Sequence, residues 1–193
     1  MSSVSVPTVI RAFLSVDIEN EALLARIEYL QRKLDTGAAR LKLVEHDNIH
    51  FTLRFLGDIS EAVAQRMHEE LSKVRFSPFN IDIAGVGAFP SVKRPNVVWI
   101  GVRSNMDRLE AIKQDIDNRL AEFGLGPERK FAAHATIARV KSITDRVSFE
   151  ASLRDLSGEV VGTMPVTAFR MTKSTLTPSG PQYETLWEVR GSP

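Results

Sequence analysis

The chain has 193 residues, 43% of them hydrophobic, so it is long enough for one sizeable core and short for two independent domains. Its 25 Lys and Arg residues balance 24 Asp and Glu residues, which argues against coating nucleic acid through bulk charge but leaves room for a local basic groove. The absence of cysteine excludes disulfides, thiolate catalysis and cysteine-ligated metals.

No segment of the sequence has the pattern of a membrane span or a signal peptide. Apolar runs such as 97–100 are far too short to cross a bilayer, and residues 1–7 lack a basic region followed by a long apolar segment. No feature requires an obligatory protein partner. We therefore expect a cytoplasmic protein that does not bind membranes.

Predicted strands and helices alternate along the chain. β-Branched and alternating apolar residues predict strands over 8–18, 41–44, 49–57, 79–89, 97–102, 131–140, 166–176 and 183–189. Apolar residues at helical spacing predict helices that follow Asn20, Ser60 and Asn105, with a weaker helix over 149–156. Residues 177–181 have the composition of a turn. Hairpin-like neighbours beside helices favour an α+β fold with mostly antiparallel sheets over a doubly wound parallel sheet.

A histidine and a threonine share one face of the strand at 49–57. The strand alternates apolar and polar residues, so that His50, Thr52 and Arg54 are expected on the face opposite the apolar residues. The His-x-Thr pattern returns 84 residues later as His134 and Thr136, again in a strand-like apolar setting. This repeat favours an internal duplication with pseudo-two-fold symmetry.

Two histidines and two hydroxyls suggest a particular chemistry. Imidazoles have an unperturbed pKa of about 6.5, so that one can act as general base and the other as general acid near neutral pH. Threonine hydroxyls beside them can stabilise charge on a phosphoryl or acyl oxygen. Such a set, without a fixed nucleophile, suits phosphodiester hydrolysis or transesterification. A structural role for each histidine remains the alternative at this stage.

Two other kinds of site are disfavoured. The Gly85-Val86-Gly87 run has Pro90 at the third glycine position and no helix after it, which argues against a dinucleotide-binding turn. Neither a His-x-His nor a His-Glu-x-x-His pattern is present, so the sequence offers too few ligands for a metal-dependent hydrolase. We expect no metal and no cofactor.

The two motifs, His50-Phe51-Thr52-Leu53 and His134-Ala135-Thr136-Ile137, resemble those of the two-histidine (2H) phosphoesterases. The resemblance is close to one branch, the RNA 2′,3′-cyclic phosphodiesterases also known as 2′-5′ RNA ligases. It extends over nearly the whole chain through segments 11–13, 48–57, 85–90, 98–101, 131–139, 173–178 and 180–184. Ala133, where proline is frequent, and Ile137, where leucine is usual, are mild departures that do not affect the chemistry.

This resemblance implies a single two-lobed phosphoesterase domain over residues 1–193, with two pseudo-symmetric antiparallel sheets, flanking helices and a central cleft. One motif comes from each lobe, at 50–52 and 134–136. The implied reaction is hydrolysis of RNA 2′,3′-cyclic phosphate ends to 2′-phosphomonoesters, as part of RNA processing, with 2′-5′ RNA ligation as a reverse activity. His50 would be the proton donor and His134 the proton acceptor, while Thr52 and Thr136 hold the non-bridging oxygens.

RNA ends or small cyclic nucleotides are therefore the expected substrates. Arg139 matches an arginine of the family pattern that neutralises the phosphate, which requires a bulge because strict alternation places it opposite His134. Arg54 is the alternative by alternation. Weaker candidates for lining the groove, in part through base stacking, are Phe51, Phe55, Lys173, Ser174 and Tyr183. A non-catalytic module that binds nucleotides or RNA ends is the rival function, although plain binding favours arginine forks.

Overall fold

The computed structural model describes residues 8–128, 131–178 and 180–192. In chain order its elements are β1 (Val9–Asp17), α1 (Glu21–Leu34), β2 (Ala39–Leu43), β3 (His50–Ser60), α2 (Glu61–Leu71), β4 (Phe79–Ser91), β5 (Arg94–Val102), α3 (Met106–Leu120), β6 (His134–Ile143), α4 (Arg146–Asp155), β7 (Val160–Val166), β8 (Ala168–Leu176) and β9 (Pro181–Arg190). Short 3₁₀ helices cover His46–Asn48 and Ala121–Phe123. Within the described ranges every helix is too short or too polar to cross a bilayer. The N-terminal residues 1–7, considered above for a signal peptide, lie outside the described residues.

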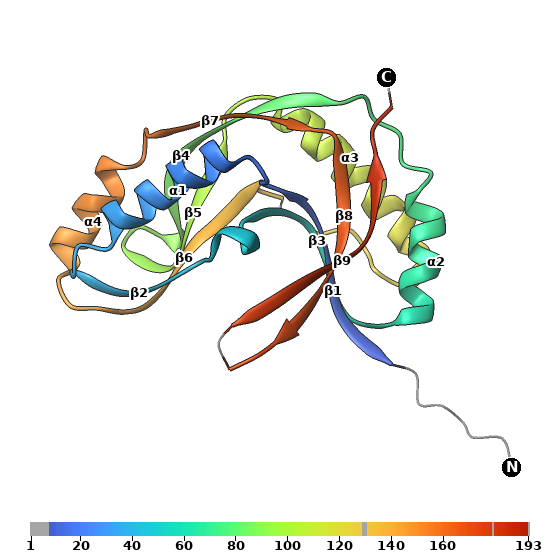
Figure 1. The fold of residues 1–193 in the computed structure, drawn as a ribbon, viewed down its shortest axis with the longest axis horizontal. Helices are drawn as coiled ribbons and strands as arrows, with labels where there is room; N and C mark the ends of the chain where they lie inside the picture. Colours follow the sequence, from blue (N-terminus) through green and yellow to red (C-terminus); the bar gives the residue numbers. More distant parts are fainter. Residues whose placement is uncertain (1–7, 129–130, 179, 193) are drawn as a thin grey trace, which may run out of the picture.

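The strands form one curved antiparallel sheet in the order β7-β4-β5-β6-β3-β1-β8-β9, with β2 paired to β6 (Figure 1). The two expected sheets are joined where β3 meets β6, through the single pair Phe51 and Ala135. Both residues are fully buried and belong to a core that extends through both halves. The predicted α+β class with antiparallel sheets is confirmed, and the two lobes share one core.

The helices form two pairs that cover the two halves of the sheet. Figure 1 shows α1 beside α4 and α2 beside α3 at opposite sides of the molecule. Helix α1 follows β1 but packs on β6 and β7, whereas α2 and α3 pack on β3. An offset of 84 residues carries α1 onto α3 and α2 onto α4 within two residues at each end. The architecture therefore repeats with the same period as the His-x-Thr motif.

Local signals predicted the starts of most helices. The Asn20 side chain accepts hydrogen bonds from two backbone amides of α1, and the Ser60 hydroxyl accepts one from Val63 in α2. Asn105 precedes α3 as predicted, but its backbone is left-handed and its amide donates to the carbonyl of Asn80, so it supplies no side-chain cap. The prediction of a side-chain cap is wrong there because the amide is used to tie α3 to β4.

One strand was missed by the sequence patterns. β7 contains Gly162 and Pro165, two residues that disfavour a strand interior. It pairs only with β4 in the sheet order, and an edge strand tolerates a proline that donates no ladder hydrogen bond. The predicted turn at 177–181 includes Ser179, which lies outside the described residues. Thr177 and Gly180 exchange backbone hydrogen bonds on either side of it.

Gly87 lets an aromatic ring approach the backbone next to the second motif. A Cβ atom at Gly87 would lie 2.2 Å from the Trp99 ring, and that ring lies 6.3 Å from the His134 ring, centroid to centroid. The glycine is therefore required for this packing and not for a dinucleotide turn.

We predict that Gly87→Ala destabilises the protein by about 1–3 kcal/mol, because the tryptophan must move to admit the methyl group. Chemical denaturation monitored by fluorescence measures the change. Gly158→Ala is the matched control, since nothing lies within 4 Å of its added Cβ. Equal stability of the two variants would contradict the close packing at Gly87.

Candidate active site

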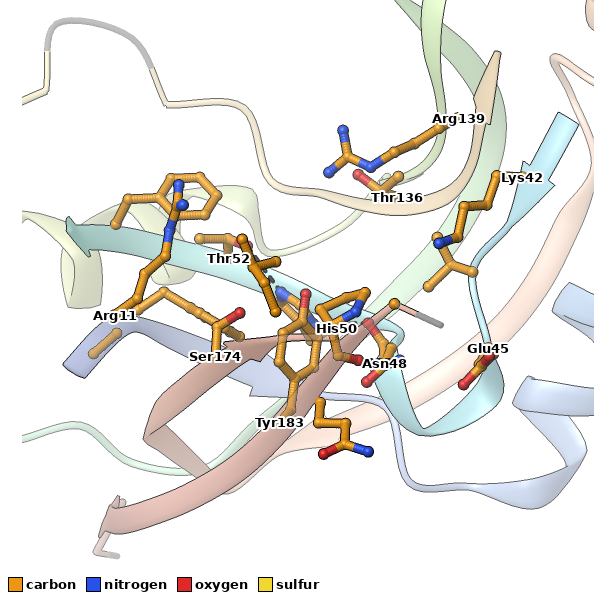
Figure 2. Close-up of a pocket in the computed structure, with 18 of the residues that line it drawn as sticks. Arg11, Lys42, Glu45, Asn48, His50, Thr52, Thr136, Arg139, Ser174 and Tyr183 are labelled. Atoms are coloured by element: carbon orange, nitrogen blue, oxygen red, sulfur yellow. Dashed lines mark hydrogen bonds between the residues drawn. The ribbon is translucent and has the colours of Figure 1, made fainter. Parts of the chain in front are cut away.

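The two His-x-Thr motifs face one cleft at the junction of the two lobes. The antiparallel pair of Phe51 with Ala135 points into the core, so the flanking residues of both strands point to the other face. There His50, Thr52, His134 and Thr136 line a cavity of about 570 Å³ (Figure 2). The structure brings together all four residues that the motif predicted.

The first histidine is oriented by its own strand. Nδ1 of His50 lies 2.9 Å from the backbone carbonyl of Asn48, and Nε2 lies 3.1 Å from the Thr52 hydroxyl. Because a carbonyl can only accept, Nδ1 carries a proton and donates it. Nε2 is therefore the nitrogen that exchanges protons with the cleft.

The second histidine is oriented in the same way. Nδ1 of His134 lies 2.7 Å from the carbonyl of Ala132, again two residues earlier in the chain. Its Nε2 is thereby left as the nitrogen available for proton exchange. The duplication thus sets both imidazoles in the same tautomer from opposite lobes.

Aromatic rings hold both imidazoles in place. Phe13 of β1 stacks on His50 at 4.6 Å between centroids, and Tyr183 of β9 meets its edge at 5.4 Å. On the other lobe, Phe89 meets His134 at 4.9 Å, with Trp99 beyond it. These contacts restrict the rotation of both rings, which preorganises the site.

A β-bulge after each threonine resets the alternation of the strand. Thr52 pairs with Ser15 and Arg54 with Leu14, so Leu53 is the extra residue of β3. In β6, Trp99 pairs with Thr136 and Val98 with Ala138, which leaves Ile137 as the extra residue. Consequently Phe55 and Arg139 turn toward the cleft. The bulge that Arg139 required is present.

Arg54 points away from the cleft, so the prediction from strict alternation is wrong for this residue. Its side chain is only 6% exposed, donates to the carbonyl of Gly126 at 2.6 Å and lies 3.5 Å from Asp117. Lys113 is paired with the same aspartate, and Glu128 lies near both cations. Arg54 therefore ties β3 to α3 and to the loop that leads to the second motif.

Four predicted groove residues lie in different places. Ser174 and Tyr183 line the cleft, whereas Phe51 is fully buried in the core because it lies on the opposite face from His50. Lys173 is outside the cleft lining and pairs with Glu184 at 3.2 Å on the adjacent strand. Phe51 and Lys173 are thus wrong as groove residues.

Several cleft residues were missed by the sequence analysis. They include three cations, and a carboxylate that lies next to the first histidine: Arg11, Lys42, Lys141 and Asp17. The 84-residue offset would have indicated Lys141, since it is equivalent to the cleft residue Gly57. Asp17 could not be found without the β1–β3 register, which pairs it with His50.

The surroundings of His50 shift its protonation. Burial lowers the pKa of His50 below the usual value of 6.5, the Asp17 carboxylate and the Asn48 carbonyl oppose this, and His134 lowers it further. Asp17 itself accepts hydrogen bonds from Ser15 at 2.7 Å and Arg170 at 3.1 Å. At the position 84 residues on, the partner of His134 is Gly101. The two histidines therefore differ in having or lacking a neighbouring carboxylate.

Burial also raises the pKa of the Tyr183 phenol, against the opposing effect of Arg139. The phenol is therefore protonated at neutral pH and can donate a hydrogen bond into the cleft. Among the described residues, no three His, Asp or Glu side chains are grouped as ligands for a metal ion.

A curved antiparallel fold with one His-x-Thr motif from each lobe is what the resemblance to the 2H phosphoesterases implies. The family model described as LigT like Phosphoesterase matches residues 16–99 and, a second time, residues 100–183. The chain therefore belongs to the LigT-like phosphoesterase family. Each matched segment contains one motif, in agreement with an internal duplication.

Similar proteins cover almost the full chain. An RNA 2′,3′-cyclic phosphodiesterase of Aeropyrum pernix is 36% identical over 171 residues, which cover 88% of this chain and 97% of the relative. One from Archaeoglobus fulgidus is 38% identical over 176 residues, covering 91% and 97%. The crystal structure of Escherichia coli LigT in apo form has a TM-score of 0.75 at 22% identity and covers 96% of this chain and 99% of LigT. This likeness shows the shared fold.

We predict that Asp17→Asn lowers the pKa of His50 further, because it removes the negative charge that favours the imidazolium. Titration of the imidazole resonances by NMR, assigned with His50→Gln, measures the shift. Glu19→Gln is the matched control, because Glu19 also pairs with Arg170 but is not among the groups that shift His50. An unchanged or raised pKa in Asp17→Asn would contradict the expected electrostatic effect.

Proposed function

We propose that this protein hydrolyses RNA 2′,3′-cyclic phosphate ends to 2′-phosphomonoesters, without a metal ion. The observation that supports this most strongly is the pair of imidazoles with both Nδ1 atoms bonded to carbonyls and both Nε2 atoms left for one cleft. The names of the relatives point the same way, since those of Aeropyrum pernix and Archaeoglobus fulgidus are RNA 2′,3′-cyclic phosphodiesterases.

The reaction requires proton transfer at two opposite positions. Water attacks phosphorus in line with the 3′-oxygen, the bond from phosphorus to the 3′-oxygen breaks, and the phosphate stays on the 2′-oxygen. Nε2 of His134 accepts the proton of the attacking water, and Nε2 of His50 donates a proton to the leaving 3′-oxygen. Motifs from opposite lobes place base and acid on the two sides of the phosphate.

The remaining polar groups stabilise the charged transition state. Thr52 and Thr136 would donate hydrogen bonds to the non-bridging oxygens, and the Arg139 guanidinium would neutralise their charge. Tyr183 and Ser174 would complete the polar lining of the same cleft. Asp17, which lies next to His50 and has no counterpart at His134, favours the protonated form of His50 and so supports its assignment as the acid.

We further propose that residues 1–193 form one phosphoesterase domain, with a motif from each lobe. The shared core and the single continuous sheet support this description. Ligation through a 2′-5′ bond would use the same site, with the 5′-hydroxyl of a second RNA in place of water. A cytoplasmic location stays a prediction.

The test is incubation of the purified protein with an RNA that ends in a 2′,3′-cyclic phosphate, in the presence of EDTA. We expect full turnover and a 2′-phosphate product, which is separated from the 3′ isomer by chromatography. Loss of turnover that a divalent ion restores would show metal dependence. Tight binding without any product would instead identify the non-catalytic module.

We predict that His50→Ala and His134→Ala each lower kcat by about 10²–10⁴-fold, the usual contribution of a positioned acid or base. The double variant is expected to lose less than the product of the single effects, since both groups act in one transition state. Thr52→Ala and Thr136→Ala should be milder, because each removes one hydrogen bond. Single-turnover rates measure all four.

A substrate whose leaving group needs no protonation separates the two roles. It should restore the rate of His50→Ala and leave His134→Ala impaired. The reverse pattern would exchange acid and base, and two unimpaired single variants would remove this pair from catalysis.

A further inference from the structure

The two halves of the cleft repeat the catalytic residues but not the residues beyond them. Each bulge is followed by two cleft-facing positions, which are Phe55 and Gly57 on β3 and Arg139 and Lys141 on β6. An aromatic ring and a glycine on one lobe thus correspond to two cations on the other. Because β3 and β6 run antiparallel, these two pairs lie at opposite ends of the cleft.

The end near Arg139 is strongly basic. Lys42 of β2 is the direct cross-strand partner of Arg139, and Lys141 follows on the same face of β6. Figure 2 shows Lys42 and Arg139 together at one end of the site and Arg11 at the other. Of the described residues that line the cleft, four are Arg or Lys and one, Glu45, is acidic. In a chain with a formal net charge of +1, positive charge is therefore concentrated here.

The opposite end is apolar at its mouth. Phe55 is 66% exposed and Leu176, at the end of β8, is 70% exposed, although both line the cleft. Large apolar side chains rarely stay exposed in a polar cleft unless a flat or apolar ligand covers them. An exposed phenylalanine beside the Arg11 guanidinium suits the stacking of an unpaired base.

We propose that the cleft binds an RNA strand in one direction, with the terminal base at Phe55 and the upstream backbone phosphates along Arg139, Lys42 and Lys141. This inference rests on the proposed function. In a nucleoside 2′,3′-cyclic phosphate, the base and the 5′ chain leave the ribose on opposite sides of the cyclic phosphate. With that phosphate held between His50 and His134, the base and the upstream chain point to opposite ends of the cleft.

The basic end extends further than one nucleotide needs. Lys141 follows His134 by seven residues, so at about 3.3 Å per residue their Cα atoms are roughly 20 Å apart along β6. A mononucleotide bound at the histidines does not reach that position, whereas the phosphates of a longer strand do. The substrate class that fits is an RNA end several nucleotides long, preferred over a free cyclic mononucleotide.

The test compares a free nucleoside 2′,3′-cyclic phosphate with a short RNA that ends in the same cyclic nucleotide. We expect Lys141→Ala to lower kcat/KM several-fold more for the RNA than for the mononucleotide. It should also lower the slope of log(kcat/KM) for the RNA against log[salt] by about 0.7, the value for one phosphate contact to a single strand. Lys141→Arg should preserve both values, and a melting curve verifies that each variant is folded.

Two further variants complete the design. Lys33→Ala removes a lysine on α1 that lies outside the cleft, so neither substrate should respond. Phe55→Ala should impair both substrates to a similar extent, because both carry the terminal base.

Three outcomes would overturn the proposal. These are equal effects of Lys141→Ala on the two substrates, a length-dependent loss in Arg11→Ala in place of Lys141→Ala, and equal kcat/KM of the wild type for both substrates. Absence of turnover with either substrate would instead refute the proposed function itself.

Discussion

The site depends on one contact, the antiparallel pair of Phe51 and Ala135 between β3 and β6. This pair lies where the two halves of the chain meet and is fully buried on the core side. Side chains alternate along a strand, so burying these two residues forces the histidine and threonine of each motif to the other face. A shift of the register by one residue would turn all four into the core. The free energy of core packing thus holds the catalytic geometry.

The bulges explain how one repeated strand performs two tasks. Up to Thr52 and Thr136 the polar residues face the cleft, and one extra residue then reverses the alternation. The reversal buries Arg54 on the first lobe, where it is paired with Asp117 and Gly126, and brings Arg139 to the substrate on the second. Bulges next to active sites have this general use, since they redirect a side chain without ending the sheet.

Departures from the internal symmetry distinguish the two lobes. Asp17 lies next to His50, whereas the equivalent neighbour of His134 is Gly101. Phe55 and Gly57 correspond to Arg139 and Lys141. A symmetric site would not distinguish acid from base, or a base-binding end from a phosphate-binding end. Substitutions at these few positions supply an electrostatic difference for each, while the duplicated core preserves the geometry.

Some of this was determined by the sequence alone. The 84-residue repeat of His-x-Thr, the alternation around it and the caps at Asn20 and Ser60 are local patterns, and they indicated the α+β class and the four central residues. Other features arise from contacts between distant segments. The tertiary structure decided that Arg54 is buried, that Phe51 is core, that β7 is a strand and that Asp17 lies beside His50. The reason is physical: a bulge, an edge position or a cross-strand neighbour depends on the register between strands, which no periodicity within one strand encodes.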